Sequence, residues 1–147
     1  MTTFEHQKTK KMFTLQQVTA AHAKVKSGAD FPAYVQEIKQ LGVLRYDFQV
    51  KIGQTEYHGA NGLRISGNAI YPEKTISIQA SSIAVRQIIA ETQQGKSDFL
   101  TFCQQVADAG VNKWVVDTQA MMCTYYDLAG QSMVAEPIPE SECDFNI

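Results

Sequence analysis

The side chains in this sequence that could act as bases, nucleophiles or metal ligands are few and widely separated. Two histidines, His22 and His58, and two cysteines, Cys103 and Cys123, stand in segments with the periodicity of folded structure, and Cys103 has the position of a packing residue in a helix. A thiol beside an imidazole forms a nucleophile–base pair, and Cys123 with either histidine would be such a pair. The surrounding residues favour packing for His22 and Cys123 and a surface position for His58. Only the fold could bring such a pair together.

Metal binding and acid–base catalysis have weaker support. Zinc needs thiolates and imidazoles that converge on one ion, and the sequence has no CxxC pair and no paired histidine spacing. The segment "GANGLRISGN" is rich in glycine but lacks the lysine of a phosphate-binding loop. Asp117, Asp127 and Glu136 could approach one another on neighbouring strands, although Asp127 suits the first position of a turn. We therefore expect no metal and no cofactor, and we assign no catalytic residue.

Aromatic residues form the most suggestive group. Trp114, Tyr125 and Tyr126 fall on predicted strands. Successive strand residues face opposite sides of a sheet, so one of the two tyrosines would lie on its second face beside Asp117. Such a mixed surface suits a partner. The candidate binding residues are His22, His58, Tyr57, Trp114, Asp117, Cys123, Tyr125, Tyr126 and Asp127.

An internal repeat predicts the elements that position these residues. Residues 30–62 and 98–130 match at an offset of 68, with 7 identities in 33 positions. Both copies begin with an amphipathic helix, preceded by an aspartate and followed by glycine and valine, and continue into alternating strand patterns. Gly53 aligns with Met121, so we expect the first hairpin turn not to be reproduced. The predicted helices are 14–26, 30–41, 82–94 and 98–109, and the predicted strands are 46–52, 55–58, 63–66, 74–79, 114–119, 121–126 and 131–136.

These elements predict an α+β fold. We expect a two-layer structure with a mostly antiparallel sheet and helices on one face, built from two helix–helix–strands pseudo-repeats. One domain would span residues 13–139, divided into about 13–80 and 81–139. Residues 1–12 are expected to form a flexible N-terminal tail, and residues 140–147 an acidic C-terminal tail.

Composition and charge exclude several classes of protein. The 147 residues are 44% hydrophobic and 19% charged, as in ordinary globular proteins, and no apolar stretch approaches the roughly 18 residues of a membrane helix. The three cysteines, the absence of CxxC spacing and the polar N-terminus predict a cytoplasmic protein without disulfides. Lysines and arginines form no compact cluster, so nucleic-acid binding is not expected.

Several phrases resemble one small family in order along the chain. They are "AAHAKVKSGADFPAYVQ", "GVLRYDF", "QQGKSDFLTFCQQVADAGVNKWVVD", "MMCTYYDLAG" and "AEPIP". The sequence resembles the YbcV-like family of small bacterial and prophage-associated proteins, often described as phage envelope proteins. The resemblance covers about residues 13–139. It implies a phage-related origin but no activity, cofactor or site residue.

Two functional hypotheses follow from the sequence. The first is a non-enzymatic binding or assembly module, such as a homodimer, that uses an open sheet face or an edge strand. The second is a small enzyme or ligand-binding protein with a pocket between the two pseudo-repeats. In that pocket His22 or His58 would lie near Cys123, Tyr125 or Asp127. The sequence favours the first hypothesis, because no catalytic group of residues has a characteristic spacing.

Overall fold

The computed structural model describes residues 12–26 and 28–139. The predicted acidic tail and all but one residue of the predicted N-terminal tail lie outside these residues. The elements are α2 (Leu15–His22), η1 (Gly28–Asp30), α3 (Phe31–Leu41), β1 (Arg45–Gln49), β2 (Gln54–His58), η2 (Ala60–Gly62), β3 (Arg64–Ser66), α4 (Ser82–Gln93), α5 (Phe99–Asp108), β4 (Lys113–Asp117), β5 (Met122–Tyr126) and β6 (Ser132–Pro137). None of these helices is long and apolar enough to cross a membrane.

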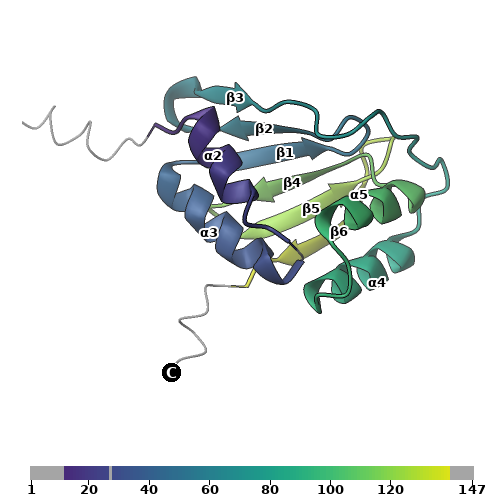
Figure 1. Ribbon diagram of the computed structural model, residues 1–147. Helices are drawn as coiled ribbons and strands as arrows, with labels where there is room; N and C mark the ends of the chain where they lie inside the picture. Colours follow the sequence, from purple (N-terminus) through teal and green to yellow (C-terminus); the bar gives the residue numbers. More distant parts are fainter. Residues whose placement is uncertain (1–11, 27, 140–147) are drawn as a thin grey trace, which may run out of the picture.

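The fold is the predicted α+β arrangement of two layers. Six antiparallel strands form one sheet in the order β3-β2-β1-β4-β5-β6. The α-helices all lie on one face of this sheet, with α2 and α3 over one end and α4 and α5 over the other (Figure 1). The helices-on-one-face prediction is therefore confirmed.

The strand register follows the 68-residue offset. Tyr46 pairs with Tyr57 in the first hairpin, and Trp114 pairs with Tyr125 in the second. At the centre of the sheet β1 and β4 pair antiparallel about Asp47 and Val115, which are themselves 68 residues apart. This pairing is the one that a two-fold relation between the halves requires. The division of the chain at about residue 80 stays a prediction.

Helix caps and apolar stripes follow the sequence pattern. The Thr14 side chain accepts a hydrogen bond from the backbone N–H of Gln17, and the Gln17 side chain accepts one from the Thr14 N–H, which completes a capping box. Asp98 caps α5 by accepting from the Thr101 N–H at 2.8 Å. The stripe of α5 buries Phe102, Cys103, Val106 and Ala107 against the sheet. Burial of these apolar side chains holds the two layers together.

Three predicted ends of helices and strands differ from the structure by two residues or more. Helix α2 ends at His22 instead of residue 26, because the chain tightens there into short-range bonds from Lys24 N–H to Ala21 and from Val25 N–H to His22. Strand β1 ends at Gln49, and β4 ends at Asp117, because the next four residues of each form the hairpin turn.

The strand predicted at residues 74–79 does not form. The backbone N–H of Lys74 donates to Lys51 in a hairpin turn, and that of Ser77 donates to Ala107 at the end of α5. These backbone bonds run to a turn and a helix end, so no neighbouring strand pairs with the segment. Ile76 is buried and anchors the segment as a connection to α4.

The two hairpin turns are alike, contrary to the prediction. Gly53 has φ of 63° and Met121 has φ of 54°, and each stands directly before the second strand of its hairpin. A left-handed conformation costs a non-glycine residue about 1–2 kcal/mol. The Met121 side chain is buried, so its packing offsets this cost.

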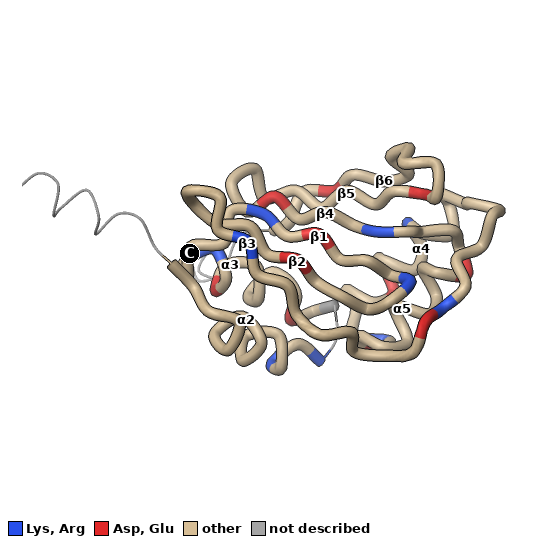
Figure 2. The backbone as a smooth tube through the Cα atoms, turned by 90° about the horizontal axis from the view of Figure 1, so that it is seen from above, with Lys and Arg blue, Asp and Glu red and all other residues tan. Residues whose placement is uncertain are grey.

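The second face of the sheet carries charged and polar side chains. Acidic and basic residues are interspersed along the strands, with the helices on the opposite side (Figure 2). On β1 the buried Tyr46 and Phe48 face the helices, so Asp47 between them faces outward. No described helix covers this face (Figures 1 and 2).

Candidate functional site

Two rows of side chains on the helix-facing side of the sheet contribute the floor of a cavity. Each row crosses neighbouring strands at paired positions, so its members stand side by side. One row runs Tyr57, Tyr46, Val116, Cys123 and Glu136, and the other runs Thr55, Phe48, Trp114, Tyr125 and Val134. Tyr57, Val116 and Val134 belong to these rows but do not line the cavity. These rows bring residues of both halves onto one surface.

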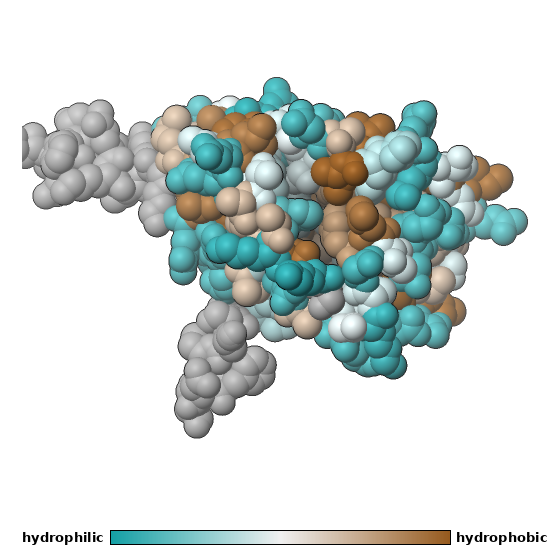
Figure 3. Space-filling model, in the orientation of Figure 1, coloured by the Kyte–Doolittle hydropathy of each residue, from teal (hydrophilic) through white to brown (hydrophobic). Residues whose placement is uncertain are grey.

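The cavity lies between this floor and the helices of both halves. Its volume is about 700 Å³. On the helix-covered face, apolar side chains gather around a hollow near the middle of the molecule (Figure 3). Helix α3 and the end of α2 supply one wall, α4 and α5 supply another, and the segment after β6 closes the edge. The lining includes Phe31, Tyr34, Tyr46, Phe48, Phe99, Phe102, Trp114, Tyr125, His22, Thr55, Ile89, Cys123 and Glu136.

Trp114 is the centre of the aromatic lining. Its ring stacks on Phe48 with centroids 4.4 Å apart, and it meets Phe102 edge-on at 5.5 Å. Phe99 lies 6.2 Å away, also edge-on, and Tyr125 lies 5.8 Å away. Offset and edge-to-face pairs of this kind hold rings at defined angles. The floor is therefore a preformed aromatic surface.

The indole N–H of Trp114 is buried in the cavity floor, with no exposed surface on the nitrogen. Its polar neighbour is the Tyr46 phenol, which has a side-chain hydrogen-bond interaction with Trp114. Burial raises the pKa of Tyr46 well above its usual range. Most buried N–H donors in proteins have an acceptor, and Tyr46 is the described group in position to supply one here.

His22, Trp114, Cys123 and Tyr125 are the predicted site residues that line this cavity. The His22 ring packs edge-on against Phe99 at 4.7 Å and Tyr34 at 5.3 Å, and burial lowers its pKa. Burial raises the pKa of the Cys123 thiol to about 12. A nucleophilic cysteine needs a lowered pKa, so Cys123 is a packed thiol in this structure.

Tyr57 has a structural position beside the cavity wall. Its hydroxyl and that of Tyr34 are 2.8 Å apart, and both side chains are buried. This bond ties α3 to β2. Burial raises the pKa of both phenols, so both remain protonated at neutral pH.

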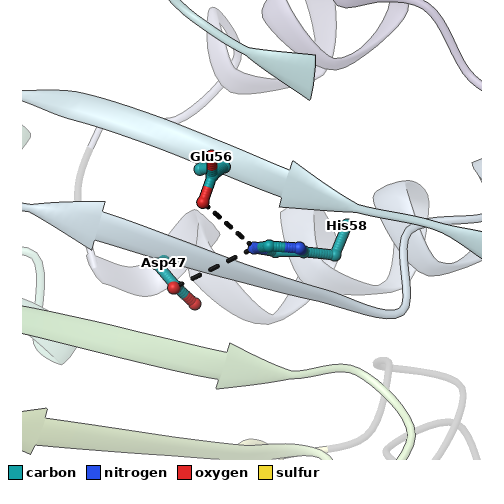
Figure 4. Close-up of side chains that lie close together, drawn as sticks. All are labelled: Asp47, Glu56 and His58. Atoms are coloured by element: carbon teal, nitrogen blue, oxygen red, sulfur yellow. Dashed lines mark ion pairs between the residues drawn. The ribbon is translucent and has the colours of Figure 1, made fainter. Parts of the chain in front are cut away.

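His58 belongs to a separate cluster on the open face of the sheet. Its Nε2 lies 3.4 Å from Glu56 Oε1 and 3.9 Å from Asp47 Oδ2 (Figure 4). These three groups could hold a metal ion by their spacing. However, Arg45 Nη2 lies 3.2 Å from the same His58 nitrogen, and Arg64 lies 3.8 Å from Glu56. Since the guanidinium can only donate, it occupies the lone pair that a metal would need.

Asp117, Tyr126 and Asp127 lie away from the cavity. Asp117 accepts hydrogen bonds from the backbone N–H groups of Gln119 and Ala120, and Asp127 accepts from Ala129 and Gln131. Both carboxylates therefore stabilise turns. Tyr126 is half-buried, and its ring lies 5.6 Å from the Lys113 ammonium.

Sequence reasoning missed most of the cavity lining. Tyr34, Phe48, Phe99 and Phe102 have the spacing of packed core residues, and that spacing is the same whether a side chain meets a neighbour or a hollow. The alternation of strand β6 places Glu136 on the helix side, and this was the available signal for its position.

Among the described residues, Cys123 is the cysteine that lines the cavity. Cys103 is a buried free thiol, and Cys143 lies outside the described residues.

A comparison with models of protein families identifies the family of this chain. Residues 19–137 match the family described as "Protein of unknown function (DUF1398)", which is most of the domain. No curated protein matches the sequence. The matched residues include every strand and every α-helix except the first part of α2. The chain belongs to the DUF1398 family.

Proposed function

We propose that this protein binds a small, largely apolar ligand in the cavity between its two halves. The single observation that supports this function is the cavity of about 700 Å³ with a largely aromatic and apolar lining. Ligand sites are typically concave, mostly apolar and about 300–1,000 Å³ in volume, with a few polar groups that orient the ligand. The ligand would pack against the half-buried rings of Phe31 and Phe99, above the aromatic floor around Trp114.

This proposal replaces the open sheet face as the preferred binding surface. The charged side chains of that face already pair with one another, as Arg45 does with Asp47 at 3.3 Å. Assembly through this face or an edge strand stays a prediction. Nucleophilic catalysis is not part of the proposal, because the Cys123 thiol is buried with a raised pKa. A phage-related role, implied by the resemblance, adds no ligand to this argument.

The proposal can be tested with the fluorescence of Trp114, which is the only tryptophan in the sequence. A suitable probe is 4-tert-butylphenol, which has a compact apolar body, an aromatic ring and one hydroxyl oxygen. We expect saturable changes in tryptophan emission and a rise in melting temperature. A flat titration with no thermal shift would refute the proposal.

A cavity-filling substitution provides the matched control. Ala33 on α3 lines the cavity and is exposed, so Ala33→Phe can fill space without breaking the core. Ala90 on α4 is also exposed but does not line the cavity. We expect Ala33→Phe to weaken probe binding by about tenfold, and Ala90→Phe to leave it unchanged. Equal binding by both variants would place the probe elsewhere.

A further inference from the structure

The charged side chains that line the cavity are acidic. Its lining contains the carboxylates of Glu37 and Glu136 and no lysine or arginine among the described residues. Burial lowers the pKa of His22, the remaining basic group, which favours its neutral form. A ligand anion would meet uncompensated negative charge, whereas a cation would be attracted.

The two carboxylates differ in their surroundings. Glu37 forms an ion pair with Lys24 at 3.1 Å, and both side chains are largely exposed. Glu136 is half-buried on β6, opposite Cys123, and no described residue forms an ion pair with it. Its charge is felt by Cys123 and Tyr125, whose ionisation it opposes. A partly buried charge without a partner is costly, and a ligand cation would compensate it.

The aromatic walls also favour a cation. A positive charge within about 6 Å of a ring centroid is attracted by the ring face, most strongly by tryptophan, and the attraction grows when water is excluded. Trp114 and Tyr125 stand beside Cys123 and Glu136 on the cavity floor, so rings and carboxylate share one surface. Quaternary and tertiary ammonium groups are the ions that such surfaces recognise.

We propose that the cavity takes an organic cation, with an apolar or aromatic body against the aromatic lining and its positive nitrogen held by Glu136. This inference rests on the proposed binding function. It adds the charge of the ligand and a specificity-determining residue.

A pair of probes with the same shape separates charge from size. The neutral probe is 4-tert-butylphenol, and the cationic probe is (4-hydroxyphenyl)trimethylammonium, in which nitrogen replaces the central carbon. At pH 7 we expect the cation to bind at least about fivefold more tightly than the neutral probe. In the Glu136→Gln variant this ratio should fall to about twofold or less, because the cation loses its carboxylate partner.

The experiment also needs a control variant and a statement of which outcomes would overturn each proposal. Glu73→Gln makes the same charge change in an exposed loop outside the cavity, and it should keep the preference for the cation. If the neutral probe binds and the cation binds no more tightly, the charge inference is overturned and the binding function stands. If neither probe binds, both are overturned. A preference for the cation that survives Glu136→Gln would overturn the role of Glu136.

Discussion

Removal of the hydroxyl pair between α3 and β2 tests how the cavity wall is held. The hydroxyls of Tyr34 and Tyr57 are 2.8 Å apart, and the two side chains are 4% and 3% exposed. The perturbation is Tyr34→Phe, Tyr57→Phe and the double substitution, each of which removes only an oxygen. Thr55 also interacts with the Tyr57 hydroxyl, whereas Tyr57 is the hydrogen-bond partner of Tyr34.

The expected magnitudes follow from which hydroxyl is left without a partner. Tyr57→Phe strands the buried Tyr34 hydroxyl, at a cost of about 1–3 kcal/mol in the free energy of unfolding. Tyr34→Phe leaves Tyr57 close to Thr55, so about 0.5–1.5 kcal/mol is expected. The double variant removes both polar groups together and should lose less than the sum of the single variants. The predicted coupling is about 1 kcal/mol.

Urea denaturation followed by far-UV circular dichroism measures these free energies. The control is Tyr126→Phe on the open sheet face, which should change the stability by less than about 0.5 kcal/mol. Additive effects of the two substitutions would refute the reasoning, because additivity means that the hydroxyls do not depend on each other. A double variant less stable than the sum would contradict it as well.

Three further predictions concern a tight contact, a buried hydroxyl and a buried imidazole. Gly110 has φ of 96°, and a Cβ there would lie 2.6 Å from the Ala80 Cα, so Gly110→Ala should destabilise by about 2–5 kcal/mol in urea denaturation. Gly130→Ala, at φ of 82° with open space around it, should cost about 1 kcal/mol. Thr118 donates to the carbonyls of Val43 at 2.7 Å and Leu44 at 2.9 Å, so Thr118→Val should cost about 1–3 kcal/mol, and an unchanged midpoint would contradict this. Because folding lowers the pKa of His22, the unfolded chain binds its proton first, so stability should fall as the pH drops below about 6.5. His22→Gln should flatten this pH dependence, and an unchanged slope would assign it to another group.

Local elements were predictable where a short stretch of chain contains its own signals. Helix α5 is an example, because Asp98 caps it, Phe102 and Val106 form its inward stripe, and Gly110 follows its end. The opposite orientations of Tyr125 and Tyr126 also follow from strand alternation alone. The alternating apolar residues around Ile76 predict a strand that does not form, because the backbone N–H groups of this segment bond to a turn and to a helix end.

The candidate site was only partly predictable. Trp114, Cys123, Tyr125 and His22 were identified as candidates, and the structure places them on one cavity. His58 was identified as well, but its partners Asp47 and Glu56 on the open face were not. Glu56 lies two residues before His58 on the same strand, which alternation indicates, whereas Asp47 is brought to them only by the β1–β2 register. The sequence predicts Asp127 at the first position of a turn. Its carboxylate accepts hydrogen bonds from backbone N–H groups of that turn, which gives it a structural role.

The sequence by itself determined which side of each helix and strand faces inward, because that depends on the spacing of apolar residues along one segment. It also determined the antiparallel hairpins and the placement of helices on one face. Only the tertiary structure decided that α3 and α4 stand far enough apart to leave a hollow over Trp114, and that Glu136 borders it with no ion-pair partner among the residues the structure describes. The separation of two helices depends on how all the side chains between them pack, and no local pattern contains that distance.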